Sequence, residues 1–248
     1  MKKIKQFIKS YFYTPSIINV GTANEETRVT WIKKTLEKIP AGSRILDAGA
    51  GECQFRKFCL HLNYVSQDFG KYDGKGDGKS LQTKNWDQSN IDIISDIVNI
   101  PEPECSFDAI MCIEVFEHLP NPAMAIKEFS RLLKPSGKLI ITAPFCSLTH
   151  FSPYHFSTGF NKYFYEKHLN EFGFQIIEIE ENGNYFEYIA QENRRLESIA
   201  YKYSNTKMKK FVKKAVIQIL KYLEECSKLD TGSKELLCFG YHVFAEKI

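Results

Sequence analysis

Three features that would quickly assign a chain to a class of protein are missing from this sequence. No stretch of its 248 residues approaches the roughly 20 apolar residues that a membrane-spanning helix needs. The seven cysteines include no CxxC pair and no spacing typical of a zinc site. The net charge of +3 is too small to indicate a nucleic-acid partner. We therefore expect a cytoplasmic protein with reduced, mostly buried cysteines that does not bind nucleic acid.

Two segments combine lysines with apolar residues at helical spacing. The N-terminal MKKIKQFIKSYFYTP begins like a signal peptide but lacks the continuous apolar core and the cleavage site. Residues 202–221 hold seven lysines and no acidic residue, and apolar positions between Met208 and Leu223 form one face. For both amphipathic helices, packing on the domain is the first interpretation. Contact with a membrane or another anionic surface is the alternative. The oligomeric state is left open.

Strand and helix patterns alternate along most of the chain, which predicts an α/β fold. We expect a doubly wound, seven-stranded, mostly parallel sheet with right-handed crossovers and a helical cap. The expected strands cover residues 44–48, 64–69, 91–95, 107–113, 138–143, 174–180 and 239–246. The expected helices of the core cover residues 24–39, 52–62, 123–133 and 163–171. The predicted parts of the chain are N-terminal cap helices (1–41), a core (42–183), a helical insertion in the cap (184–234) and the last strand (235–248).

The stretch RILDAGAGEC, residues 44–53, joins an apolar strand to a glycine turn. Gly49 and Gly51 let the backbone turn tightly and approach a ligand closely. A dinucleotide-binding loop would have a third glycine at position 54, where this sequence has Gln54. The helix expected after the turn would present free N–H groups, which suit a carboxylate as well as a phosphate. The missing glycine disfavours NAD(P), which remains the alternative cofactor.

Acidic residues fall at or just past the ends of four expected strands. They are Asp47, Asp68, Asp96 and Glu114. Because ligands of such sheets bind beyond the carboxyl ends of the strands, we expect the four acids near one site. They would repel each other unless a ligand rich in hydroxyls, amines or positive charge lay between them. The simpler interpretations are a brace for the glycine turn at Asp47 and a helix cap or a solvated loop residue at Asp96.

The chain resembles the class I S-adenosylmethionine-dependent methyltransferases in these segments. ILDAGAG matches the family's first motif, YVSQDF matches the segment whose acid binds the ribose, and SDIVNIP matches the segment that frames the adenine. FDAIMCIEVFEHLPNP and LLKPSGKLIITAP match the fourth-strand and fifth-strand regions. The resemblance covers roughly residues 42–182 and the last strand, and implies that this strand is antiparallel and inserted in the sheet. It implies that the cofactor site contains Asp47, Ala48, Gly49, Ala50, Gly51, Gln54, Asp68, Phe69, Asp96, Ile97, Ile113 and Glu114.

Glu114, Glu117 and His118 form an E-x-x-E-H segment after the fourth expected strand. The segment resembles that of quinone-biosynthesis O-methyltransferases, where such residues are associated with a divalent ion. The same Glu-His pair is also widespread in metal-independent members of the superfamily. We therefore expect no metal, with Glu114 near the methionine end of the cofactor and His118 on the substrate side.

The segment THFSPYHFSTGF, residues 149–160, follows the fifth expected strand and is dense in histidine and aromatic residues. An enzyme that methylates a hydroxyl with the help of a base needs a pKa near neutrality, which histidine supplies. The candidate bases are His155 and His150. The candidate substrate-binding residues are His118, Tyr154, His155 and Thr158. The alternative is that these side chains only pack the loop, because positioning alone can accelerate methyl transfer.

These features predict an S-adenosylmethionine-dependent methyltransferase that releases S-adenosylhomocysteine and acts on a small molecule or a glycan precursor. O-methylation is the first expectation, because no NPPY-like segment follows the fourth strand. N-methylation of a small molecule is the alternative. A different class of protein, which binds the cofactor without catalysis and interacts through its basic helices, is a further alternative. The fold by itself does not identify the acceptor.

Overall fold

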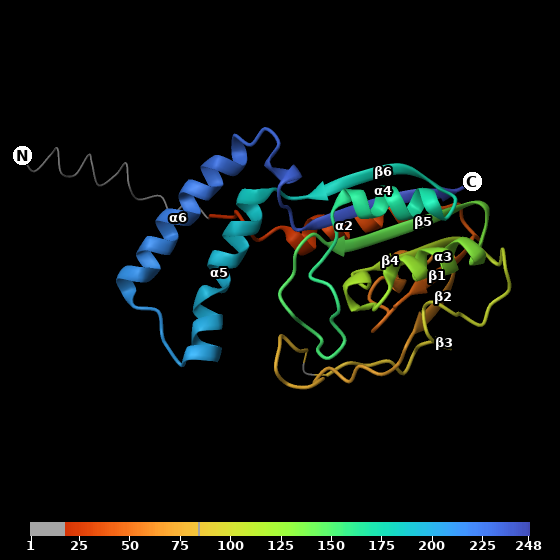
Figure 1. Cartoon of the computed structure of the whole chain (residues 1–248), viewed down its shortest axis with the longest axis horizontal. Coiled ribbons are helices and arrows are strands. Elements are labelled where there is room, and N and C mark those ends of the chain that lie inside the picture. The colour runs from red at the N-terminus through yellow and green to blue at the C-terminus, as the bar shows by residue number, and fades with distance from the viewer. Residues whose placement is uncertain (1–17, 84) are drawn as a thin grey trace, which may run out of the picture. The chain divides into compact units, whose positions relative to one another are not determined.

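The computed structural model describes residues 18–83 and 85–248 of the chain (Figure 1). The chain divides into two compact units. The sheet unit consists of Asn24–Tyr185 and Gly232–Ile248, and the described residues of the helical unit are 18–23 and Phe186–Thr231. The amphipathic helix predicted at the N-terminus lies outside the described residues.

Seven strands form one sheet in the order β3-β2-β1-β4-β5-β7-β6. The strand β7 is antiparallel to both of its neighbours, β5 and β6, whereas the other pairs of neighbours are parallel. This confirms the predicted sheet, with its last strand antiparallel and inserted. The strands are β1 (Arg44–Ala48), β2 (Asn63–Asp68), β3 (Ile93–Ile94), β4 (Phe107–Ile113), β5 (Leu133–Pro144), β6 (Phe174–Asn182) and β7 (Gly240–Lys247).

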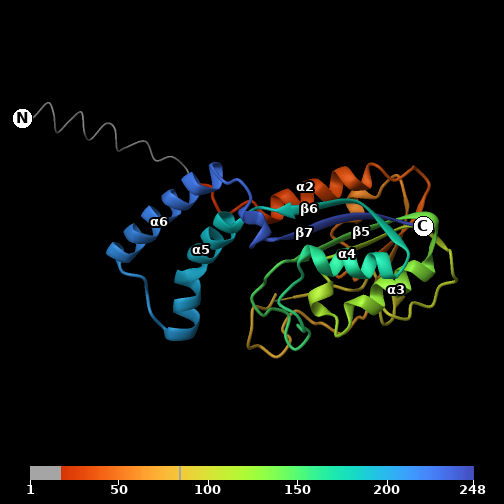
Figure 2. The ribbon, with the colours of Figure 1, turned by 45° about the horizontal axis from the view of Figure 1, so that its top comes forward.

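Helices cover both faces of the sheet, as Figure 2 shows. The helix α2 (Asn24–Leu36) lies on one face, and α3 (Pro122–Leu132) and α4 (Lys162–Glu171) lie on the other. Successive side chains of a strand point to opposite faces, so β4 contributes to both hydrophobic cores. Met111 belongs to the cluster that contains Ile32 of α2, and Ile110 belongs to the cluster that contains Phe129 of α3.

Local sequence signals explain where α3 begins and where α4 begins and ends. Pro122 occupies the first turn of α3, where its missing N–H costs no hydrogen bond. Asn161 caps α4, because its side chain accepts a hydrogen bond from the backbone N–H of Phe164. Gly173, with a φ of +78°, takes the left-handed conformation that ends α4 before β6.

The connection between β1 and β2 corrects one prediction. Residues 52–62 form no α-helix, and only Arg56–Phe58 is helical, as the short 3-10 helix η1. The φ angles of Gly51 and Cys53 are +52° and +56°, which are left-handed values that a right-handed helix does not contain. The glycine turn is therefore not followed by the positive helix end that the sequence suggested.

Two further predictions differ from the structure, namely the basic helix expected over residues 202–221 and the place of α2. The basic helix expected over residues 202–221 is interrupted at residues 205–209, between α5 (Tyr185–Ser204) and α6 (Lys210–Lys228). Leu220 and Leu223 pack in the unit's core, but Phe211 and Ile219 of the expected packed face are 69% and 44% exposed. The helix α2, assigned above to the cap, belongs to the sheet unit. The cap itself stays a prediction.

The described part of the chain contains no helix with the length and hydrophobicity needed to span a membrane.

Asp47 is a buried acid in β1, with only 2% of its surface exposed. The hydroxyl of Tyr64, on the neighbouring strand β2, donates a hydrogen bond to its Oδ2 at 2.5 Å. Burial raises the pKa of the Asp47 carboxyl to about 7, against the opposing effect of the Tyr64 hydrogen bond. These contacts join Asp47 to β2, and its proposed role as a brace for the glycine turn stays a prediction.

Removing a fully buried ring from α3 should destabilise the sheet unit. Phe129→Ala leaves a cavity, and we expect it to lower the free energy of unfolding by about 3–5 kcal/mol. Both tryptophans, Trp31 and Trp86, lie in the sheet unit, so their fluorescence during urea unfolding measures the effect. Met124→Ala, on the same helix with 39% of the residue exposed, is the matched control and should cost less than about 1 kcal/mol. Similar losses in both variants would contradict the assigned core.

The raised pKa of Asp47 predicts how stability depends on pH. Folding favours the neutral carboxyl, so this contribution is complete below about pH 4 and is lost as the pH rises through about 7. Asp47→Asn cannot ionise and should reduce the difference in unfolding free energy between about pH 5 and pH 8 by about 2 kcal/mol. Urea unfolding of both proteins at the two pH values measures this difference. A variant that keeps the full difference would show that Asp47 is ionised in the folded protein.

Candidate functional site

Two long loops meet beyond the carboxyl ends of the parallel strands, where ligands bind in sheets of this kind. One covers residues 70–92 and the other residues 145–160. Leu81 and His150 form an isolated β-bridge between the loops. The backbone N–H of Asp77 donates to the carbonyl of Ser152 at 3.0 Å. The glycine-rich loop is therefore paired with the histidine-rich loop and forms part of the candidate site.

The glycine turn after β1 needs glycine at two positions. Gly49 has a φ of +79° and Gly51 a φ of +52°. A Cβ atom on Gly49 would lie 2.5 Å from a methyl group of Val115, and one on Gly51 would lie 2.6 Å from the Trp86 ring. Backbone conformation and close contact thus both exclude larger residues. Trp86, which the sequence analysis did not single out, covers the turn from the loop at 70–92.

Asp68 ends β2 and ties that strand to the glycine turn. Its Oδ2 accepts a hydrogen bond from the backbone N–H of Gly51 at 3.0 Å. Its Oδ1 accepts from the backbone N–H of Gly70 at 2.9 Å and from the side-chain amide of Gln88 at 2.7 Å. The carboxylate is buried, and its orientation is fixed by donors on both oxygens. This places the acid predicted to bind the ribose directly beside the turn.

The other predicted cofactor residues differ in exposure. Gln54 and Asp96 are exposed, and Asp96 accepts a hydrogen bond from the backbone N–H of Val98 at 3.1 Å, as in a local turn. The half-buried ring of Phe69 meets the edge of Tyr154, with 4.9 Å between the centroids. Four residues have buried side chains, namely Ala48, Ala50, Ile97 and Ile113. Their contact with a cofactor stays a prediction.

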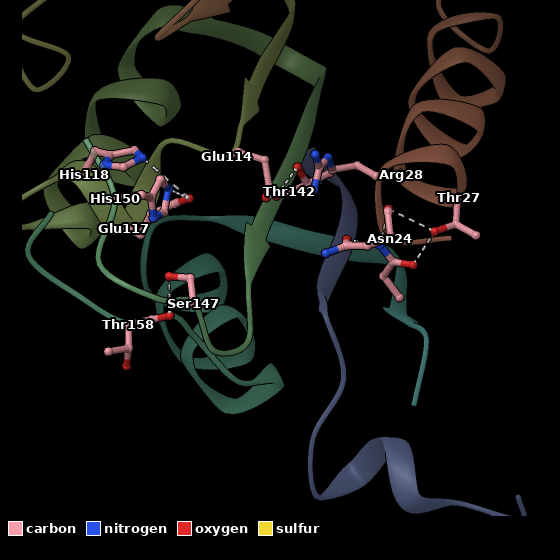
Figure 3. Close-up of polar contacts among 11 residues, drawn as sticks. Asn24, Thr27, Arg28, Glu114, Glu117, His118, Thr142, Ser147, His150 and Thr158 are labelled. Atoms are coloured by element: carbon pink, nitrogen blue, oxygen red, sulfur yellow. Dashed lines mark hydrogen bonds and ion pairs between the residues drawn. The ribbon is translucent and has the colours of Figure 1, made fainter. Parts of the chain in front are cut away.

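Glu114 lies just past β4 and forms an ion pair with an arginine that the sequence did not mark. Its Oε2 forms an ion pair with Arg28 at 3.0 Å, and its Oε1 accepts from the Thr142 hydroxyl at 2.9 Å (Figure 3). Arg28 belongs to α2, far from Glu114 in the sequence. No motif marks this arginine, so only the packing of α2 on the sheet brings the pair together.

A polar cluster fixes the N-terminal turn of α2 and so positions Arg28. The side-chain amide of Asn182, at the end of β6, donates to the carbonyl of Asn24 at 3.0 Å. Thr27 donates to the Asn182 side-chain oxygen. Asn182 is buried, and its two hydrogen bonds to α2 are partly buried.

Glu117 lies at the centre of a histidine cluster. Its side chain is 1% exposed, and its Oε1 lies 3.7 Å from Nε2 of His118 and 3.8 Å from Nε2 of His150 (Figure 3). Burial and the neighbouring Glu114 raise the pKa of the Glu117 carboxyl well above its usual range. Burial lowers the pKa of His118 to about 3, so this imidazole is neutral. Glu114 and Glu117, the two acids of the E-x-x-E-H segment, therefore lie in different surroundings.

The imidazole of His155 is oriented by Ser147. The Ser147 hydroxyl donates its one proton to the carbonyl of Thr158 at 2.9 Å, so its oxygen accepts from Nε2–H of His155 at 3.2 Å. This tautomer leaves Nδ1 of His155 unprotonated. Burial lowers the pKa of His155, so the ring is neutral near pH 7. Thr158 is exposed and takes part through its carbonyl, so its side chain as a substrate contact stays a prediction.

Aromatic rings connect the glycine turn to the histidine cluster. Phe151 stacks on Tyr72 at 4.5 Å and on His118 at 5.1 Å. Trp86 meets the edges of Tyr72 and Phe151. None of these three aromatic residues was among the predicted site residues, because their loops carry no periodic pattern. Together they give the candidate site an apolar wall.

Comparison with known proteins gives a consistent assignment. The family described as "Methyltransferase domain" matches residues 23–221 of the chain. A ubiquinone biosynthesis O-methyltransferase from Xanthomonas axonopodis pv. citri (strain 306) is 30% identical over 118 residues, which is 46% of this chain and 48% of the relative. One from Dechloromonas aromatica (strain RCB) is 26% identical over 126 residues, again 46% of this chain and 49% of the relative. The chain thus spans about half the length of the curated relatives it matches.

Solved structures share the fold at low sequence identity. A S-adenosylmethionine-dependent methyltransferase from Archaeoglobus fulgidus superposes with a TM-score of 0.55 at 16% identity, covering 90% of this chain and 94% of that one. The [4+2]-cyclase SpnF superposes with a TM-score of 0.53 at 17% identity, covering 92% and 83%. On the family match, the strand order and the glycine turn, the chain belongs to the class I S-adenosylmethionine-dependent methyltransferases.

Proposed function

We propose that the protein transfers a methyl group from S-adenosylmethionine to an oxygen atom of a small molecule or a glycan precursor. The observation that carries the proposal is the neutral His155, held with Nδ1 unprotonated at the edge of the sheet that also holds Asp68. The name of the curated relatives, ubiquinone biosynthesis O-methyltransferase, supports an oxygen acceptor. Nitrogen as the acceptor atom is the less supported alternative.

The residues at the strand ends fit the cofactor chemically. Asp68 would accept hydrogen bonds from the two ribose hydroxyls, in place of the one donated by Gln88. Arg28 would bind the carboxylate of the methionine part, and Glu114 its ammonium group. Gly49 and Gly51 would let the backbone approach this part closely. When bound, S-adenosylmethionine supplies a methyl group on a cationic sulfonium that a nucleophile can displace.

The histidine-rich loop would activate the acceptor. Nδ1 of His155 would accept the proton of the acceptor hydroxyl while Ser147 holds the ring through Nε2. Burial lowers the pKa of His155, which favours the neutral form of the base. Phe151 and Trp86 would exclude water from the reacting atoms.

The location and contacts of the protein belong to the same proposal. All seven cysteines are free thiols, which supports a location in the reducing cytoplasm. The lysine-rich helix α6 with its exposed Phe211 supports contact with an anionic surface.

A protein that only binds the cofactor and interacts through α6 is the second candidate. SpnF, described as a cyclase, shows that this fold is not confined to methyl transfer.

A screen for methyl transfer separates the two candidates. The protein is incubated with S-adenosylmethionine labelled on the methyl group and with phenols, sugar nucleotides or lipid-linked sugars. Label in an oxygen-linked product would support the proposed function. Measured binding of the cofactor, without transfer to any acceptor in the screen, would favour the binding protein.

Loss of the Asp68 carboxylate should weaken cofactor binding. Asp68→Ala removes the hydrogen-bond acceptor proposed for the ribose hydroxyls, and we expect the Kd of S-adenosylmethionine in calorimetry to rise by roughly tenfold or more. Asp73→Ala, which changes an exposed acid in the neighbouring loop, should leave the Kd unchanged. An Asp68→Ala protein that folds and binds with the parent affinity would overturn the ribose assignment.

Loss of the His155 imidazole should slow turnover more than it weakens cofactor binding. His155→Ala removes the proposed base, and we expect kcat to fall by roughly 100-fold or more while the cofactor Kd changes little. His168→Ala, a histidine of α4 that pairs with Glu171, is the matched control and should retain full turnover. The opposite result, a weakened cofactor with preserved kcat, would place His155 in the cofactor site.

A further inference from the structure

The methyl transfer proposed above leaves the buried carboxyl of Glu117 without a role. Glu117 is almost fully buried, yet among the described residues no hydrogen-bond partner reaches its Oε2. Its Oε1 faces Nε2 of both His118 and His150, at distances of 3.7 and 3.8 Å. These distances exceed those of hydrogen bonds, so the buried carboxyl, whose Oε2 has no hydrogen-bond partner, faces two imidazole nitrogens without bonding to either.

The tautomers of both histidines follow from their other contacts. Nδ1 of His118 lies 2.5 Å from the carbonyl of Tyr154, and Nδ1 of His150 lies 2.8 Å from the carbonyl of Leu148. Carbonyl oxygens only accept hydrogen bonds, so both Nδ1 atoms carry a proton. Both rings therefore direct their other nitrogen, Nε2, toward Glu117. One proton on the carboxyl could satisfy only one of the two nitrogens.

A carboxylate oxygen and two imidazole nitrogens that converge on one point form the donor set of a metal site. The ligand atoms of Glu117, His118 and His150 lie within 4.8 Å of one another. Tetrahedral coordination at the usual zinc–nitrogen distance puts ligand atoms about 3.4 Å apart, so small movements would suffice. Metal-bound histidines typically donate their other N–H to a backbone carbonyl or a carboxylate, as both histidines do here.

We propose that Glu117, His118 and His150 bind a divalent transition-metal ion such as Zn²⁺. The ligands are a carboxylate oxygen of Glu117 and the Nε2 atoms of His118 and His150. Two imidazoles and one carboxylate suit zinc and its transition-metal neighbours better than magnesium, which prefers oxygen ligands. Three protein ligands leave a coordination position open to a small molecule.

The ligand set differs from the one that the sequence motif suggests. Glu114, the first acid of E-x-x-E-H, is bound by Arg28 and Thr142 and is not part of the cluster. His150 takes the third place from the loop after β5, so the site joins two segments 32 residues apart. The proposed site departs from the expectation that no metal is involved. It gives His150 the role of a ligand in place of the predicted role of a base.

Metal titration of the full chain tests the proposal. The protein is freed of metal with a chelator and titrated with ZnCl₂ in a calorimeter, without cofactor or acceptor. We expect one equivalent to bind with a Kd in the micromolar range or below. Glu117→Gln and His150→Ala should each weaken binding by roughly 100-fold or more, beyond the effect of losing an outer hydrogen bond. His168→Ala is the histidine control, and Glu114→Gln is the carboxylate control. His168→Ala should bind as the parent does, and Glu114→Gln should not weaken binding.

X-ray absorption of the zinc-loaded protein gives a second measurement that needs no variant. Nitrogen and oxygen neighbours at about 2.0–2.1 Å would support the site, whereas a sulfur shell at about 2.3 Å would assign the ion to cysteines. The proposal is wrong if no zinc binds, if Glu114→Gln weakens binding as much as Glu117→Gln, or if His150→Ala has no effect. Because the titration uses no cofactor or acceptor, its outcome is independent of the methyl-transfer test.

Discussion

The site depends on the hydrogen bonds that the buried carboxylate of Asp68 accepts. This carboxylate accepts the backbone N–H of Gly51, and so fixes the glycine turn after β1 to the end of β2. The parallel pairing of β1 with β2 brings the two segments side by side, although 17 residues separate them in the chain. No α-helix follows the turn. Its backbone N–H at Gly51 is therefore bound by this carboxylate and is not part of a helix end. Trp86 and Gln88 then pack over the turn from the neighbouring loop.

The four acids at the strand ends do not need one common ligand to offset their repulsion. Burial raises the pKa of Asp47 to about 7, which lowers its negative charge, and Tyr64 is its hydrogen-bond donor. Asp68 uses backbone and amide donors, and Asp96 is exposed in a local turn. Glu114 is paired with a guanidinium from α2. The repulsion argument from the sequence is therefore answered by separate partners, and the case for the cofactor depends on the family and the geometry.

The fold was predictable from the sequence because its signals are local. Apolar runs that end in glycine, proline or acidic residues marked the strands, and Pro122 and Asn161 stand where α3 and α4 begin. Residues 52–62 were misassigned because their apolar spacing suits a helix, whereas the left-handed backbone at Cys53 does not. That conformation is set by the packing of the turn against β2, which helical periodicity does not report. The basic segment was misplaced for a related reason, since its lysines continue through the break at residues 205–209.

The sequence by itself determined the α/β class, the glycine turn and the acid that follows it one strand later. These features are encoded in short segments whose spacing follows from the geometry of strands and turns. Only the tertiary structure decided which partner each chemical group receives. It paired Arg28 with Glu114, and it set His150 with Glu117 and His118 around one point. Such contacts join loops and helices that are distant along the chain, and their distances depend on packing that no local pattern of residues records.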